Sequence, residues 1–167
     1  MKFKNILKEV ITTKAYAMAR TIEQDPLQSF MFKVIIHDGT NNVEIGFQKV
    51  SGLSREVEVI EYMEGMQDRA YKLAGRESVG EVTFERGMYA DSSLQTYYEK
   101  ILNNTSARYT IDIEILDRTK VIRRKFTLSE CWFSKYEIGD LDATSSDVII
   151  ETLTVQFEQF EVAQIQK

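Results

Sequence analysis

Three kinds of side chain in this sequence of 167 residues could carry chemistry: one histidine, one cysteine and a run of carboxylates. His37 precedes Asp38 and Gly39, which are typical of a hairpin turn. A Ser-His-Asp triad needs a serine beside an oriented histidine, and no serine here lies in a nucleophile-elbow sequence. Cys131 precedes Trp132 in an apolar strand, so we expect a buried, inert thiol. One histidine and one cysteine are too few for a structural zinc site, and we expect no catalytic residue.

The carboxylates recur in residues 140–151, which read DLDATSSDVIIE. Asp140 and Asp142 stand at the first and third positions and Glu151 at the twelfth, as in a calcium-binding loop. The sixth position should be glycine and is Ser145, and the residues that follow have the pattern of a strand and not of a helix. A polar turn, in which Asp and Ser or Thr side chains bind backbone amides, is favoured over a calcium site. We expect no metal and no cofactor.

Two further features suggest phosphate binding but lack the residues for it. Gly75 and Gly80 have the spacing of P-loop glycines, but Glu81 stands where the loop needs lysine. The densest basic cluster, residues 123–125, lies in an expected strand, where neighbouring side chains point to opposite faces. The net charge of −5 also argues against a concentrated positive field. We expect no nucleic acid as a specific ligand.

The composition is that of one folded domain, with 43% hydrophobic and 28% charged residues. The single cysteine excludes an intramolecular disulfide, which favours assembly in the cytoplasm. No apolar run approaches the roughly 20 residues of a membrane span. The start of the chain is unlike a signal peptide, because Lys8, Glu9 and Lys14 interrupt its apolar stretch. We expect no stable membrane association.

The hydrophobic pattern divides the chain into a helical extension at residues 1–24 and a β-rich domain at residues 25–167. In the extension, apolar residues recur at helical spacing and basic residues fall largely on other faces. Pro26 marks the boundary, since the residue before proline disfavours helix. A helix of this length needs cover from its own domain, a neighbouring subunit or a membrane surface.

The β-rich domain is expected to be mainly β, with two packed antiparallel sheets in a sandwich or barrel and one internal helix. Alternating apolar residues predict strands, and a helical stripe after Ser92 predicts the helix. Val57 and Val59 alternate with glutamates, which predicts a strand with one wet face. We expect seven or eight strands, at residues 30–36, 43–47, 57–59, 82–84, 109–115, 121–128, 131–138 and 148–160, the last being the longest.

Several segments resemble, in order along the chain, motifs of one protein family. Residues 25–34 resemble the opening of these proteins. Residues 47–53, FQKVSGL, match the pattern F-x-x-V-S-G-L, and residues 59–65, VIEYMEG, resemble V-x-E-Y-R-x-G. Residues 72–75 resemble K-L-P-G, and residues 82–87 resemble I-T-L-K-R-G. Residues 132–136 resemble A-W-P-x-K-Y, and residues 140–151 resemble D-L-D-A-S-S-N-E-V-A-I-E. The family is that of tail tube proteins from contractile phage tails and phage-tail-like contractile injection systems, which is related to the type VI secretion tube protein.

The resemblance implies a structural protein and not an enzyme. It implies hexameric rings stacked into a hollow conduit for cargo, inside a contractile sheath and tipped by a spike. Sheath protein, spike or baseplate proteins and cargo effectors are the implied partners, and a phage tail would also let DNA pass through. Residues 56–72 are the implied contact with a neighbouring subunit or ring. The motif residues implied to set the fold and the ring contacts are Val50, Ser51, Gly52, Leu53, Glu61, Tyr62, Gly65, Gly75, Arg86, Gly87, Trp132, Tyr136, Asp140, Asp142, Ser145 and Glu151.

Three alternatives stay open at this point. The N-terminal extension departs from a minimal tube subunit, so the chain could be a tube-initiating paralogue that joins the tube to the spike. A small-ligand-binding β-barrel is a reading from another class. A membrane-surface protein that uses the cationic N-terminal helix is the third.

Overall fold

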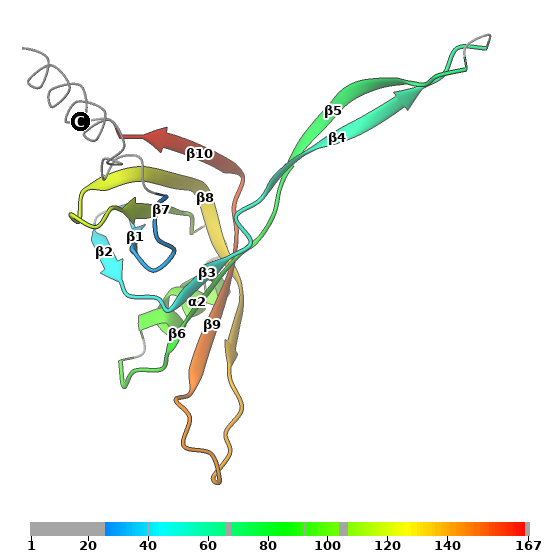
Figure 1. The fold of residues 1–167 in the computed structure, drawn as a ribbon. Coiled ribbons are helices and arrows are strands. Elements are labelled where there is room, and N and C mark those ends of the chain that lie inside the picture. Colours follow the sequence, from blue (N-terminus) through cyan, green and yellow to red (C-terminus); the bar gives the residue numbers. More distant parts are fainter. Residues whose placement is uncertain (1–25, 40, 66–67, 92, 104–106, 166–167) are drawn as a thin grey trace, which may run out of the picture.

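The computed structural model describes residues 26–39, 41–65, 68–91, 93–103 and 107–165 of the chain. The proposed helical extension at residues 1–24 and the proposed helix cap Ser92 lie outside these ranges. The described part contains ten strands and one helix (Figure 1): β1 (Phe32–His37), β2 (Asn42–Ile45), β3 (Lys49–Ser51), β4 (Arg55–Tyr62), β5 (Tyr71–Val79), β6 (Val82–Gly87), α2 (Ser93–Asn103), β7 (Tyr109–Leu116), β8 (Ile122–Ile138), β9 (Ile150–Gln156) and β10 (Gln159–Gln164).

The long strand β8 joins the two halves of the body. Its first half pairs with β7 on one side and β10 on the other, and its second half pairs with β9. The complete order is β2-β1-β7-β8-β9-β6-β3, with all pairs antiparallel. Glu130 has a φ of 55° where β8 changes partners, and Figure 1 shows the strand bending between its two halves. One continuous strand therefore supplies both packed sheets.

The core lies between these two sheets and is closed by α2. Alternate residues of β1 and β7 face inward, as their exposure of 1% or less for Val34, Ile36, Ile111 and Ile113 shows. The helix buries Leu94 and Tyr97 against them. An aromatic cluster fixes this contact, because the Tyr97 ring meets the Tyr109 ring edge to face at 5.6 Å and the Phe133 ring at 5.8 Å. The expected architecture of two antiparallel sheets and one internal helix is confirmed.

Strands β3 and β5 were not expected from the sequence, and several expected strand boundaries differ from the observed ones. Residues 121–128 and 131–138 form the single strand β8, so the expected break between them is wrong. The expected final strand, residues 148–160, is instead β9 and β10, because the chain crosses between the sheets at the buried Phe157. The first strand begins at Phe32, and Phe30 before it is 71% exposed.

Gly52 follows β3 in a conformation that only glycine adopts easily. Its φ is +89°, and a Cβ built there would lie 2.1 Å from the backbone oxygen of Glu81. We expect Gly52→Ala to lower the free energy of unfolding by about 1–3 kcal/mol from backbone strain, and by more from the overlap. Urea unfolding measures this, with Gly46→Ala as the control, because no atom lies within 4 Å of a Cβ there. Equal midpoints for the two variants would contradict the prediction.

Candidate functional site

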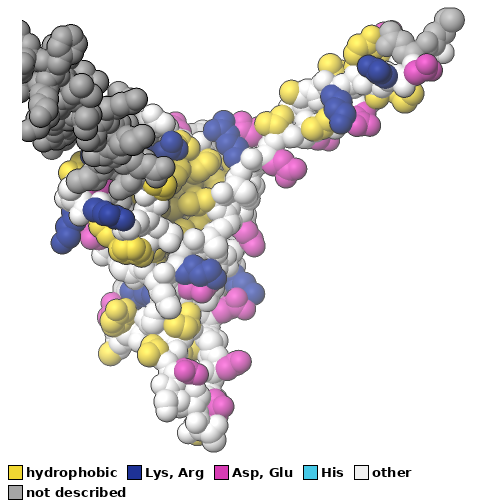
Figure 2. All heavy atoms as spheres, in the orientation of Figure 1, with side chains coloured by type: hydrophobic (Ala, Val, Ile, Leu, Met, Phe, Trp, Pro, Cys, Tyr) yellow, Lys and Arg dark blue, Asp and Glu magenta, His cyan; other side chains and the backbone are white. Residues whose placement is uncertain are grey.

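Strands β4 and β5 form an arm that projects from the body (Figure 1). The two strands pair only with each other, and all eight residues of β4 are exposed. The expected wet face is present, but the opposite face is exposed as well in the single chain, since Val57 and Val59 are 49% and 60% exposed. Figure 2 shows apolar and charged side chains alternating along the arm.

Both faces of the arm carry apolar side chains. The strand register places Val59 opposite Ala74 on one face. On the same face Glu61 and Lys72 form an ion pair across the strands, with 3.7 Å between Lys72 Nζ and Glu61 Oε1. The other face carries the cross-strand pairs Ile60 with Leu73 and Tyr62 with Tyr71, all about half exposed. A two-stranded sheet with both faces apolar and exposed is marginal in water unless other surfaces cover it.

Contacts at the root of the arm join its two strands, and one of them reaches the body. Gly80 N donates to Ser54 O at 3.2 Å, and a Cβ at Gly80 would overlap the Ser54 hydroxyl. Arg55 pairs with Glu77 across the two strands, and its Nη1 donates to the Phe160 carbonyl of β10 at 3.5 Å. Gly75 lies within β5, and a Cβ added there would lie 3.0 Å from the Glu58 backbone oxygen.

Three of the predicted motif residues meet in a buried polar network. Arg86 of β6 pairs through Nε with the Glu151 carboxylate of β9, and the two residues are 5% and 3% exposed. Tyr136 Oη of β8 donates to Glu151 Oε2 at 2.9 Å. Arg86 Nη2 donates to Ser93 Oγ at 3.0 Å, where α2 begins. The network therefore ties three neighbouring strands to the helix.

Burial in this network also shifts a pKa. Burial raises the pKa of Tyr136 to about 12, and its hydrogen bond to the negative Glu151 adds to the effect. Tyr136 is thus a neutral donor at physiological pH. Beside the network, Gly87 leaves room for the Val148 side chain, whose Cγ1 would lie 3.3 Å from an added Cβ.

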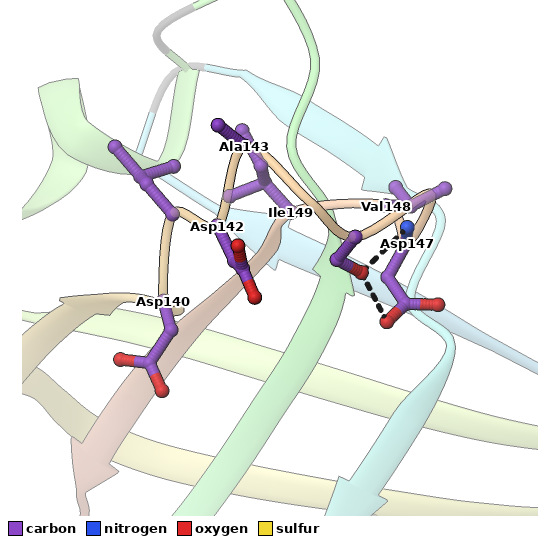
Figure 3. Close-up of a pocket in the computed structure, with 8 residues that line it drawn as sticks. Asp140, Asp142, Ala143, Asp147, Val148 and Ile149 are labelled. Carbon is purple, nitrogen blue, oxygen red and sulfur yellow. Dashed lines mark hydrogen bonds between the residues drawn. The ribbon is translucent and has the colours of Figure 1, made fainter.

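The loop between β8 and β9 carries the calcium-like segment, at the opposite end of the body from the arm (Figure 1). Asp142 Oδ1 accepts from the backbone N of Thr144 at 2.8 Å and from its hydroxyl. Ser145 Oγ donates to Asp147 Oδ2 at 2.6 Å (Figure 3). The hydrogen bonds from Thr144 also lower the pKa of Asp142.

These contacts support the polar turn rather than the calcium loop. Glu151 is turned inward to Arg86 and does not reach the loop's carboxylates as a ligand. No group of three metal-ligating side chains lies together among the residues that the structure describes. Asp140 and Asp142 line an open pocket with Leu141 and Val148, whose side chains are 76% and 70% exposed.

The remaining motif residues are scattered. Val50 and Ser51 belong to the short strand β3, and Leu53 packs against the core. Trp132 is half-buried on β8, and Gly65 lies exposed beyond the end of β4. These residues therefore shape the body and the arm but do not converge on one site.

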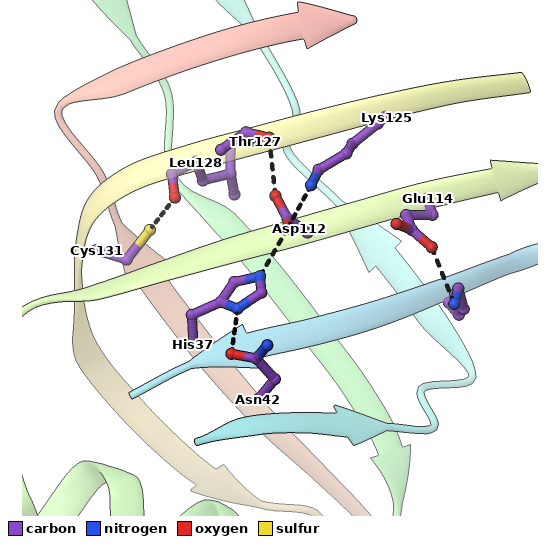
Figure 4. A network of polar contacts seen from close by, with 9 residues as sticks. His37, Asn42, Asp112, Glu114, Lys125, Thr127, Leu128 and Cys131 are labelled. Carbon is purple, nitrogen blue, oxygen red and sulfur yellow. Dashed lines mark hydrogen bonds and ion pairs between the residues drawn. The ribbon is translucent and has the colours of Figure 1, made fainter. Parts of the chain in front are cut away.

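A second polar network was not predicted from the sequence (Figure 4). Asp112 of β7, only 4% exposed, accepts from His37 Nε2 at 2.6 Å, Lys125 Nζ at 2.7 Å and Thr127 Oγ1 at 2.8 Å. Burial opposes ionisation of Asp112, but these donors outweigh it and lower its pKa. The pKa of His37 is raised, first by its hydrogen bond with Asn42 and then by Asp112. The signal for this network in the sequence was the alternation of Asp112 with apolar residues.

A β-rich body with buried polar ties and an exposed apolar arm is typical of a subunit that assembles with other protein surfaces. The sequence matches the family model of the T4-like virus tail tube protein gp19 over residues 28–161. The chain therefore belongs to this tail tube protein family, as the sequence motifs predicted. This family assignment is favoured over the alternative of a small-ligand-binding barrel.

Solved structures agree with this assignment. A chain of the cryo-EM structure of the anti-feeding prophage (AFP) baseplate is 29% identical, with a TM-score of 0.79 over 86% of this chain and 99% of that chain. A chain of the PVC sheath-tube complex, an extracellular contractile injection system, is 20% identical, with a TM-score of 0.77 over 86% and 95%. A crystal structure of an Hcp protein shares the fold at 11% identity, with a TM-score of 0.52 over 80% and 99%. Among curated protein sequences, none matches the chain.

The buried ion pair predicts a large effect of Glu151→Gln on stability. The amide leaves the buried Arg86 guanidinium with only the exposed Asp91 carboxylate as a countercharge, at 3.8 Å from its Nη2, so we expect the free energy of unfolding to fall by about 3 kcal/mol. The matched control is Glu137→Gln, in the exposed ion pair between Lys135 and Glu137, which should cost less than about 1 kcal/mol. Urea unfolding of both variants measures the difference, and similar losses would contradict the role given to Glu151.

Burial predicts that Cys131 does not react in the folded protein. Its side chain is fully buried, and burial raises the pKa of its thiol to about 12. At pH 8 only about one thiol in ten thousand is then the reactive thiolate. We expect no labelling by iodoacetamide in the native state and complete labelling in urea, as measured by mass spectrometry. Rapid native labelling would show that the core opens.

Proposed function

We propose that this tail tube protein forms hexameric rings, which stack into a hollow conduit for cargo inside a contractile sheath. The observation that carries the proposal is the arm, whose two apolar faces have no partner layer within the described chain. The 29% identical AFP chain comes from a structure with 6-fold symmetry imposed, which supports six copies in a ring. A ring contact of this kind should bury more than about 1,000 Å².

The body offers edges that suit a closed ring. Within the sheet β2-β1-β7-β8-β10, the two end strands are β2 and β10, and each pairs on one side only among the described strands. An open edge is a ready site for pairing with another chain. Because the two edges differ, contact between them is heterologous, and such contacts generate rings when the rotation closes.

The expected partners follow from the relatives. The PVC structure is a sheath-tube complex and the AFP structure is a baseplate, which supports sheath and baseplate proteins as neighbours of this chain. We propose a structural and non-enzymatic role, and protein cargo inside the conduit. No helix among the described residues is long and apolar enough to cross a membrane.

A tube-initiating subunit is the second candidate, and one observation favours it. The AFP baseplate chain is 29% identical, whereas the chain from the PVC sheath-tube complex is 20% identical. A subunit beside the baseplate and spike would form one ring at the end of the tube instead of its length. Long tubes formed by the purified chain favour the bulk subunit, and single rings favour the initiator.

Assembly should depend on the apolar side chains of the arm. In the double variant Val57→Asp, Val59→Asp, each copy loses two apolar side chains from the contact, and each is worth about 1.5 kcal/mol or more when buried. We therefore expect association to weaken at least about 100-fold while the body stays folded, because neither side chain belongs to the core. Electron microscopy and sedimentation of the full chain measure rings, tubes and monomers, and circular dichroism verifies folding.

The matched control is Val57→Ile with Val59→Ile, which keeps the apolar surface and should assemble. A wild-type chain that stays monomeric at high concentration would contradict the proposed function. If the double aspartate variant assembles at the same protein concentration as the wild type, the arm does not form part of the contact between copies.

A further inference from the structure

We propose that the pocket of the β8–β9 loop binds the N-terminal segment, residues 1–24, of another copy of this chain. The residues that line this loop pocket include Asp140, Leu141, Asp142, Asp147, Val148 and Ile149. The contact goes beyond the proposed function, in which the arm and the sheet edges join the copies, and it rests on the assembly proposed there. The family match begins at residue 28, so the segment adds to the fold that the family shares.

The loop pocket presents an exposed apolar surface. Leu141 and Val148 are among the most exposed large apolar side chains of the described residues, and Ile149 beside them is also exposed. Met88 extends this surface, since its backbone N donates to the Ile149 carbonyl at 2.8 Å and its side chain is exposed. A cluster of exposed apolar side chains marks a contact with another protein surface or segment.

Carboxylates surround these apolar side chains. Figure 3 shows Asp140, Asp142 and Asp147 around the loop pocket, and neither lysine nor arginine is among the described residues that line it. The hydrogen bonds from Thr144 lower the pKa of Asp142, so its carboxylate is negative at physiological pH. The loop pocket therefore suits a segment that is apolar on one side and positively charged on the other.

Residues 1–24 combine these two properties. The segment carries five basic residues against two acidic ones, although the whole chain has a net charge of −5. The basic residues are Lys2, Lys4, Lys8, Lys14 and Arg20. Apolar residues recur between them at helical spacing, at Phe3, Ile6, Leu7, Val10 and Ile11. A sequence of this kind needs cover for its apolar stripe, and an apolar groove with opposite charge provides it.

The segment joins the body at the other end of β8 from the loop pocket. Leu116 N, where β7 ends, donates to Met31 O at 2.8 Å, and Met31 N donates to Gln28 O at 3.2 Å. The first described residues therefore lie beside the β7–β8 turn, whereas the loop pocket follows the last residue of β8, which is 17 residues long. Copies placed end to end bring the segment of one to the pocket of the next, and such a heterologous contact repeats from copy to copy.

Photo-cross-linking from the loop pocket tests this contact. Leu141→Cys in the full chain is coupled to benzophenone maleimide, which keeps the position apolar, while the native Cys131 is fully buried. Subunits of this variant are mixed before assembly with an excess of nitrogen-15-labelled wild-type subunits, irradiated as rings or tubes and mapped by mass spectrometry. Val148→Cys is the second attachment site, and Leu102→Cys, an exposed position of α2, is the matched control.

We expect both pocket positions to cross-link to nitrogen-15-labelled residues 1–24, at least about 10-fold more often than the Leu102→Cys control does. The triple variant Lys4→Glu, Lys8→Glu, Lys14→Glu reverses the charge of the segment and should lower this yield at least about 10-fold. The triple variant with arginine at the same three positions keeps the charge and should cross-link as the wild type does.

Three outcomes in assembled rings or tubes would overturn the inference and leave the proposed function intact. Cross-links to residues 55–79 would show that the arm of a neighbouring copy fills the loop pocket. Cross-links only within one copy, or none to residues 1–24, would show that the segment does not join copies there. An unchanged yield in the glutamate variant would contradict the charge complementarity. Failure of the wild-type chain to form rings or tubes by electron microscopy would reject the proposed function and this contact with it.

Discussion

A hairpin of two strands has no second layer on which to bury its side chains, and this constraint governs the molecule. The arm carries valines on one face and isoleucine, leucine and tyrosines on the other, all exposed in the single chain. Burial of such side chains stabilises by about 1.5–3 kcal/mol each, so the arm gains its stability only when other surfaces cover it. The body has its own hydrophobic core, whereas the apolar side chains of the arm have no covering layer within the described chain.

The body must therefore hold the arm and the opposite loop firmly without the help of a larger core. The continuous strand β8 serves both sheets, and the Arg86–Glu151 pair crosses from β6 to β9 and reaches α2 through Ser93. A buried pair of this kind adds little net stability compared with apolar packing, but breaking it leaves a buried charge. It favours one arrangement of strands and helix, which an assembling subunit needs because its contact surfaces must repeat.

Period-two alternation was enough to predict a mainly β fold, and motif order was enough to predict the family. The ends of the strands were harder to predict, because Ser129 and Glu130 look like a turn and yet lie within β8. Arg86 and Glu151 were both singled out, but their contact spans 65 residues and no local pattern reports it. The sequence could not show that the valine face of β4 is also exposed, because alternation with glutamate looks the same whether the partner surface is the same chain or another one.

The distribution of side chains on the surface follows from what each region must touch. Exposed apolar residues lie on the arm and on the β8–β9 loop, at opposite ends of the molecule (Figure 1). On the outer face of the body sheet, the carboxylates of Asp112 and Glu114 are paired with lysines of the same chain. A face that satisfies its own charges gains nothing from a partner. The physical rule that makes the apolar arm adhesive therefore makes this face inert.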